Sequence, residues 1–140
     1  MGKAQAQIER PTAETIWAML QELGFEFIEA SQNKVIKDKK KNIIAGVDFV
    51  LEDDDKVMLI EIKSKLELDD IKEHIERMEK IRTYAKLRND NRIYVGAIGG
   101  MIIKANEKTY ALKNGFYVIE PSGETFTITV PEGIYSPREW

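Results

Sequence analysis

The 140-residue chain contains no cysteine, one histidine and four prolines. Without cysteine it has no disulfide framework and no thiolate zinc site, and a single histidine is a weak basis for a metal site. The absence of cysteine suits a reducing compartment, so we expect a cytoplasmic protein. No apolar run reaches the ~20 residues of a membrane-spanning helix. The polar start, MGKAQAQIER, has no signal-peptide core, so we expect no membrane partner.

The chain also lacks an excess of positive charge, because its formal net charge is -3. Dedicated nucleic-acid binders are usually basic. Any contact with nucleic acid would therefore depend on a local basic cluster, on a metal ion or on weak binding. A hydrophobic content of 43% and a charged content of 32% are typical of a folded globular chain. We expect a flexible lead-in over residues 1–11 and a single domain over residues 12–140.

Hydrophobic periodicity predicts helices and strands in a definite order. Helices are expected at residues 12–23, 70–88 and 104–114, and strands at 25–30, 43–51, 57–63, 92–100, 115–120 and 124–130. Residues 31–42 are expected to hold a lysine-rich turn, and Asp70 with Glu73 resembles a capping box. The order α-β-β-β-α-β-α-β-β predicts an α/β fold, with a mixed β-sheet flanked by helices.

The strands at 43–51 and 57–63 flank an acidic turn and carry charged residues in unexpected places. A four-residue turn over residues 53–56 puts Asp48 opposite Glu61 and Gly46 opposite Lys63. Because side chains alternate along a strand, the three charged groups share one face. The other face is apolar and should pack against a helix; it holds Val47, Phe49, Leu51, Met58, Ile60 and Ile62.

Two opposed carboxylates, ~5 Å apart at Cβ, repel each other unless a cation compensates. Asp48 and Glu61 therefore predict a site for Mg²⁺ or Mn²⁺, next to the space left by Gly46. Such an ion supports phosphodiester cleavage, and Lys63 would orient or deprotonate a water or steady developing charge. The alternative is an ordinary Glu-x-Lys on a half-exposed strand. A one-residue slip in register would also put Asp48 on the opposite face from Glu61.

These residues resemble the signature of the PD-(D/E)XK nuclease superfamily, which has the restriction-endonuclease-like fold. The resemblance spans roughly Thr12 to Ile98, an α-β-β-β-α-β core to which a short helix and a C-terminal β-hairpin are added. It rests on Asp48 in one strand and Glu61-Ile62-Lys63 in the next. Val47 stands where the family name has proline, at a position that varies among members. The tail GFYVIEPSGETFTITVPEGIYSPREW resembles the end of a poorly characterised branch often found behind a coiled coil.

The resemblance implies a catalytic set and a metal site. Asp48, Glu61 and the backbone carbonyl of Ile62 would bind Mg²⁺ or Mn²⁺, and Lys63 would assist the water or the transition state. Many members add a glutamate from the first helix, for which Glu14 is the candidate. An acid is also favourable in a first helical turn without any metal, and the sequence does not separate the two roles.

The only basic cluster is predicted either to contact a nucleic-acid backbone or to be a solvated turn. It consists of Lys34, Lys37, Lys39, Lys40 and Lys41. Lys41 is up to ~23 Å along a strand from Asp48, so both touching one phosphate is not expected. His74, beside the apolar stripe of the long helix, is expected at the border of the core.

Two classes of function remain open at this point. The first is a metal-dependent nuclease acting on DNA, with RNA or branched DNA as further substrates. The second is a catalytically silent module on the same fold for nucleic-acid or protein interaction, including a homodimer formed through the terminal hairpin. In that second class, Lys63 simply neutralises the two acids.

Overall fold

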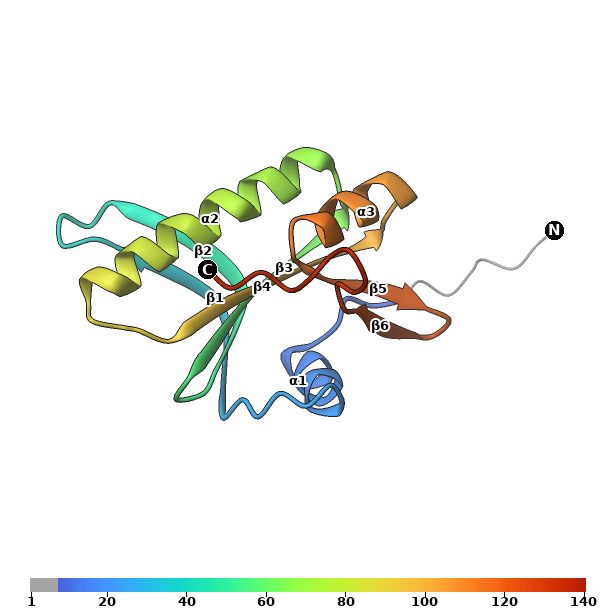
Figure 1. Cartoon of the computed structure of the whole chain (residues 1–140), viewed down its shortest axis with the longest axis horizontal. Coiled ribbons are helices and arrows are strands. Elements are labelled where there is room, and N and C mark those ends of the chain that lie inside the picture. The colour runs from blue at the N-terminus through green and yellow to red at the C-terminus, as the bar shows by residue number, and fades with distance from the viewer. Residues whose placement is uncertain (1–7) are drawn as a thin grey trace.

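The computed structural model describes residues 8–140, in which a six-stranded mixed sheet has helices on both faces (Figure 1). The helices are α1 (Ala13–Glu22), α2 (Leu68–Leu87) and α3 (Ala105–Lys113). The strands are β1 (Glu29–Lys37), β2 (Ile43–Glu52), β3 (Lys56–Lys65), β4 (Ile93–Ile102), β5 (Tyr117–Ser122) and β6 (Thr125–Thr129). Figure 1 shows α2 and α3 on one side of the sheet and α1 on the other.

The six strands lie in the sheet in chain order, from β1 to β6. β1, β2 and β3 are antiparallel neighbours, as are β5 and β6. β3, β4 and β5 are parallel, because α2 and α3 each carry the chain back along the sheet. Parallel strands covered on both faces are near-continuously apolar, and β4 is buried from Tyr94 to Gly100. β3 is likewise buried from Val57 to Ile62, and its last two residues, Ser64 and Lys65, are exposed.

The helix α2 covers one face of the sheet with its apolar stripe. Ile71, Met78 and Ile81 are at most 3% exposed. They cluster with Val57 and Leu59 of β3. Burying a side chain of this size contributes about 1.5–3 kcal/mol to stability. The stripe therefore fixes which side of α2 faces the strand that carries Glu-x-Lys.

The helix α1 closes the opposite face. Thr12 caps its start, since Thr12 Oγ1 accepts a hydrogen bond of 3.1 Å from the Thr15 N–H. Ile16 and Leu20 are fully buried and cluster with Ile60 on β3. The sheet is thereby sandwiched, and polar groups on its central strands need partners inside the fold.

The predicted α/β order of elements is confirmed, but the predicted extent of the first strand is wrong. A strand was expected at 25–30, followed by a turn within 31–42. The strand β1 instead runs from Glu29 to Lys37, and only residues 38–42 connect it to β2. β1 is an edge strand that pairs along β2, and such strands tolerate lysine side chains in water. The lysine-rich turn is present but shorter than expected: Lys39, Lys40 and Lys41 lie in it, whereas Lys34 and Lys37 belong to β1.

The predicted start of the long helix is also displaced. The helix begins at Leu68, and Asp70 Oδ2 accepts a hydrogen bond of 2.9 Å from the Glu67 N–H. The cap therefore pairs Asp70 with Glu67 rather than with Glu73. Glu67, Asp69 and Asp70 are all acidic and each could begin the helix, so the sequence alone was ambiguous.

Candidate functional site at the β2–β3 divergence

The register of the β2–β3 hairpin is the one that the four-residue turn predicts. Glu52 pairs with Val57, and the ladder continues to Phe49, which pairs with Ile60. Backbone pairing stops there, although both strands continue. The two strands therefore diverge at the next position, which is where Asp48 and Glu61 stand.

Side chains replace the backbone hydrogen bonds across this opening. Glu61 Oε1 accepts a hydrogen bond of 3.1 Å from the Asp48 N–H. Asp48 Oδ2 accepts one of 2.9 Å from the Ile62 N–H. The structure thus brings together the two predicted carboxylates and the residue between Glu and Lys. We call the opening bordered by Asp48, Glu61 and Ile62 the carboxylate gap.

A backbone irregularity in β1 and β2 accompanies the carboxylate gap. β1 and β2 pair on both sides of Asn33 and Asp48, but these two residues are not partners. Asn33 has φ of 51°, a left-handed conformation that asparagine adopts more readily than most residues. Val47, expected on the apolar face with Ile62, instead lies in the core beneath α2 and is 3% exposed. That expectation is wrong because the alternation of β2 is interrupted at Asp48.

Glu61 is buried beside an arginine. The residue is 5% exposed, and its Oε1 lies 3.8 Å from Arg77 Nε of α2. Burial raises the pKa of Glu61 to about 7; the Arg77 charge opposes this rise and the Asp48 carboxylate adds to it. Glu61 therefore changes its charge near neutral pH, where an ordinary glutamate is fully ionised.

Arg77 is held in place by a buried histidine. Arg77 Nη1 lies 2.9 Å from His74 Nδ1, and His74 Nε2 lies 3.2 Å from the Leu59 carbonyl oxygen. Because arginine only donates hydrogen bonds, Nδ1 accepts and the Nε2–H donates to Leu59. Burial lowers the pKa of His74 to about 3, and the Arg77 charge lowers it further. His74 is fully buried, so its expected place at the border of the core is wrong.

A second arginine reaches the gap from the segment before α1. Arg10 Nη1 donates a hydrogen bond of 3.0 Å to the Ile62 carbonyl oxygen, and Arg10 Nη2 donates one of 2.6 Å to Ser64 Oγ. Arg10, Asp48 and Ile62 line one small pocket of about 170 Å³. A cation thus binds the carbonyl that the resemblance implies as a metal ligand. Of the predicted lead-in, residues 1–7 lie outside the described residues.

Lys63 and Glu14 are less closely tied to the carboxylates. Lys63 is half-buried on β3, and its charge contributes to the low pKa of His74. In residues 8–140 it forms no ion pair within 4.0 Å of Asp48 or Glu61. Glu14 is exposed in the first turn of α1, and no hydrogen bond or ion pair joins it to the gap in this part of the chain. Its role as a further ligand stays a prediction.

The donor atoms at the gap fit a hard divalent cation. Across the described residues, no group of three acidic or histidine side chains is placed to hold an ion. The carboxylates of Asp48 and Glu61 nevertheless lie close enough to interact with each other, and the Ile62 carbonyl oxygen belongs to the same segment of β3. Mg²⁺ characteristically binds one or two carboxylates and keeps several waters or substrate phosphates. Two carboxylates and a carbonyl match that pattern.

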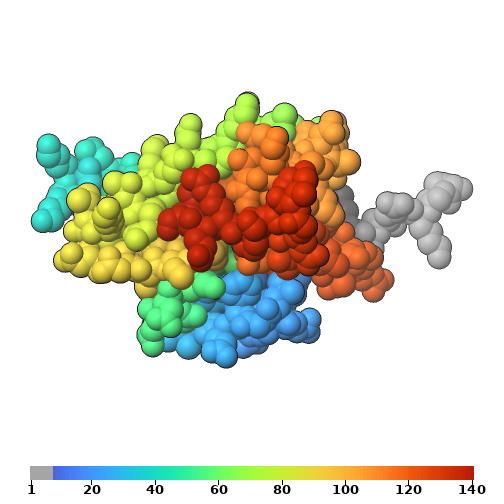
Figure 2. Space-filling view, in the orientation of Figure 1, coloured from blue at the N-terminus to red at the C-terminus, as the bar shows by residue number. Residues whose placement is uncertain are grey.

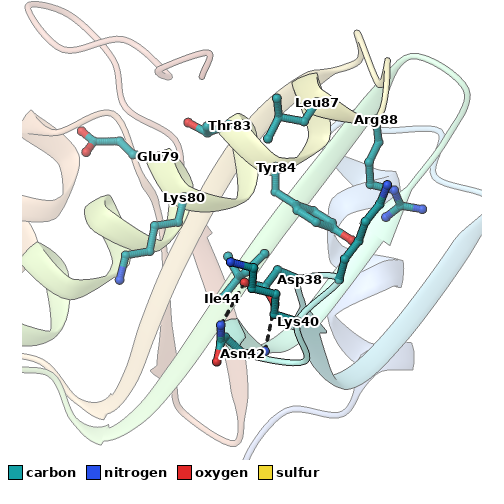
Figure 3. A pocket seen from close by; sticks show the side chains of 11 residues that line it. Asp38, Lys40, Asn42, Ile44, Glu79, Lys80, Thr83, Tyr84, Leu87 and Arg88 are labelled. Carbon is teal, nitrogen blue, oxygen red and sulfur yellow. Dashed lines mark hydrogen bonds between the residues drawn. The ribbon is translucent and has the colours of Figure 1, made fainter.

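The predicted lysine cluster is divided between β1, which holds Lys34 and Lys37, and the connection to β2, which holds Lys39, Lys40 and Lys41. The end of this β1–β2 hairpin, drawn in cyan, projects from the rest of the molecule (Figure 2). Two of the lysines, Lys39 and Lys40, line a groove of about 940 Å³ between this hairpin and α2. Figure 3 shows residues of the hairpin facing those of the helix across it. We call it the hairpin groove; it is lined by Asp38, Lys39, Lys40, Asn42, Ile44, Glu79, Lys80, Thr83, Tyr84, Leu87 and Arg88.

The residues that sequence reasoning missed are the two arginines at the gap. Arg77 carried a weak signal, because it follows His74 by three residues on the helix after the Glu-x-Lys strand and so shares its face. Arg10 carried none, since its contact depends on how the segment before α1 crosses β3. Sequence reasoning identified the lysines of the hairpin. It did not identify the two cations that face them across the hairpin groove, Lys80 of α2 and Arg88 directly after it.

Comparison of the chain with protein-family models, with curated proteins and with solved structures finds no match. No helix within residues 8–140 is long and apolar enough to cross a membrane.

Proposed function

We propose that this chain is a divalent-metal-dependent nuclease that hydrolyses phosphodiester bonds in DNA, on a restriction-endonuclease-like fold. The observation that supports it most is the replacement of the β2–β3 ladder by the carboxylates of Asp48 and Glu61. Burying a carboxylate such as Glu61 is costly, and a bound cation is one way to offset that cost.

The residues of the gap have separable roles in this proposal. Asp48, Glu61 and the Ile62 carbonyl would hold Mg²⁺ or Mn²⁺, which when bound polarises a phosphate oxygen and lowers the pKa of a water. The backbone N–H groups of Asp48 and Ile62 orient the two carboxylates. Lys63 extends from the same strand as Glu61 and would neutralise charge on the phosphate or orient the water.

Calorimetric titration with Mg²⁺ and Mn²⁺, followed by DNA cleavage assays, tests the proposal. Asp48→Asn and Glu61→Gln should each lose saturable metal binding and cleavage. Asp54→Asn is the matched control, because Asp54 is an exposed acid in the turn of the same hairpin. Cleavage that persists in Glu61→Gln at the wild-type rate would refute the assignment of the site.

A catalytically silent interaction module is the second candidate, and one observation favours it. Arg77 already faces Glu61, and Arg10 already occupies the Ile62 carbonyl. The charges at the gap are thus partly compensated by the chain itself. In that case wild-type protein binds no divalent ion at millimolar concentration, and the same titration distinguishes the two candidates.

A further inference from the structure

The hairpin groove has features that the carboxylate gap does not use. We propose that it binds a single-stranded stretch of DNA and leads it to the gap, so that the preferred substrate has unpaired bases next to the cleaved bond. This inference rests on the proposed nuclease function and specifies the form of its substrate.

The floor of the groove offers apolar and aromatic surface. Ile44 of β2 lies opposite Tyr84 and Leu87 of α2, and Leu87 is 79% exposed. Figure 3 shows the Tyr84 ring extending from α2 into the space toward the hairpin. Unpaired bases stack on such rings whatever their sequence. A duplex presents phosphates and base edges instead of base faces, so this floor suits a single strand.

The rim of the groove carries more positive than negative side chains, although the net charge of the whole chain is -3. Lys39 and Lys40 stand on the hairpin, with Lys80 and Arg88 opposite them on α2. Two carboxylates, from Asp38 and Glu79, also line it. Asp38 is engaged within the turn, where its Oδ1 accepts a hydrogen bond of 2.9 Å from the Asn42 N–H. The remaining excess of cations complements a phosphate backbone.

The groove continues toward the carboxylate gap. Ile44 and Lys80 also line a smaller cleft with Ala45, Gly46, Glu73, Glu76 and Arg77. Arg77, which faces Glu61, links this cleft to the gap, and the two glutamates partly offset its positive charge. A side chain at Gly46 would meet no atom within 4 Å, so this passage is open. Four strand positions separate Ile44 from Asp48, which is ~13 Å. The rim cations therefore bind phosphates beside the cleaved bond rather than the cleaved phosphate itself.

Fluorescence anisotropy on the full chain, with EDTA present, tests the inference apart from catalysis. The probe is a labelled oligothymidylate of ~15 nucleotides, the upper range of known single-strand sites, and the comparison is a blunt duplex of equal length. Tyr84→Ala is paired with Tyr84→Phe, which keeps the ring. Lys80→Ala is paired with Lys113→Ala, an exposed lysine on α3. Circular dichroism checks that each variant is folded.

We expect the single strand to bind more tightly than the duplex. Tyr84→Ala should weaken binding about 5- to 150-fold, the effect of losing one stacked base, while Tyr84→Phe stays near wild type. Lys80→Ala should lower the slope of log K against log salt by about 0.7, and Lys113→Ala should leave it unchanged.

Three outcomes would overturn the inference: duplex binding as tight as that of the single strand, wild-type affinity in both Tyr84→Ala and Lys80→Ala, or no oligonucleotide binding at low salt. Because no metal is present, none of these outcomes removes metal binding or cleavage of duplex DNA. Failure of the groove is therefore distinguishable from failure of the nuclease proposal.

Discussion

Arg77 Nε lies 3.8 Å from Glu61 Oε1, with 11% and 6% of the two side chains exposed. An ion pair this deeply buried is costly to break, because the charge that remains is shielded from water. Arg77 has a second partner in Glu73, whose Oε1 lies 3.4 Å from Arg77 Nη2, whereas Arg77 is the only cation paired with Glu61 among the described residues. Arg77 also donates to His74, so its position is fixed from two sides. Arg77 and the Asp48 N–H, which donates to Glu61 Oε1, therefore hold the Glu61 carboxylate at the gap.

Arg77→Met should destabilise the fold in a pH-dependent way. We expect the free energy of unfolding to fall by about 3–5 kcal/mol at pH 8, where Glu61 is ionised and loses its partner. The loss should be smaller at pH 5, where Glu61 is protonated. Urea denaturation at both pH values measures it. The double variant with Glu61→Gln should recover much of the loss, and equal losses at pH 5 and pH 8 would contradict the prediction.

Glu61→Gln should stabilise the protein at alkaline pH. An unfolded glutamate loses its proton near pH 4.5, whereas Glu61 in the fold loses it near pH 7. Between these values the folded state binds more protons, so wild-type stability falls as pH rises. Glutamine has no such loss. At pH 8 the melting temperature of the variant should exceed that of wild type, by roughly 3–5 °C for each kcal/mol gained in unfolding free energy. At pH 4 the two melting temperatures should lie closer together.

The control for that comparison is Asp54→Asn, which changes an exposed acid on the same hairpin. Its melting temperature should follow that of wild type across the same pH range. A Glu61→Gln variant whose difference from wild type is constant from pH 4 to pH 8 would show that Glu61 titrates normally.

Arg10→Ala should tighten divalent metal binding. The Arg10 guanidinium donates to the Ile62 carbonyl oxygen and brings a positive charge to the gap. Releasing one such hydrogen bond corresponds to about 0.5–1.5 kcal/mol, or a 2- to 10-fold gain in affinity. Calorimetric titration with Mn²⁺ measures the change. Arg88→Ala, at the far end of α2, removes the same charge without touching the gap, and weaker binding by Arg10→Ala than by Arg88→Ala would reverse the interpretation.

Two glycines near the site should respond in opposite ways to alanine. A Cβ at Gly99 would lie 2.4 Å from the Ile119 carbonyl oxygen and 2.9 Å from Ile62 Cδ1, so β5 would have to move. We expect Gly99→Ala to cost about 1–3 kcal/mol. A Cβ at Gly46 meets nothing within 4 Å, and Gly46→Ala should be near neutral. Thermal unfolding of both variants measures the two losses of stability. An equal loss in both would show that steric crowding at Gly99 does not determine the effect.

Local pattern was enough to predict the hairpin and its two acids. The turn length set the register from Glu52 to Phe49, and that register put Asp48 opposite Glu61. The extent of β1 was not predictable in the same way. Lys34 and Lys37 resembled the lysines of the turn that follows, and only their pairing with β2 places them in a strand.

The electrostatics of the site depended on contacts far apart in the chain. Arg10 and Ile62 are 52 residues apart, and Arg77 comes from a helix whose facing side is set by packing. His74 read as a border residue because its helix neighbours are mixed in polarity. It is buried because Phe116, from the segment before β5, packs 4.9 Å from its ring.

The left-handed conformation of Asn33 also bears on whether the protein aggregates in concentrated solution. β1 is an edge strand, and a long flat edge is a template on which another chain can add a strand and begin to aggregate. The left-handed backbone at Asn33 interrupts that template, and Lys34 and Lys37, which both follow it on β1, would repel a second copy. We therefore expect the position that bends the strand beside the carboxylate gap to disfavour edge-to-edge self-assembly as well.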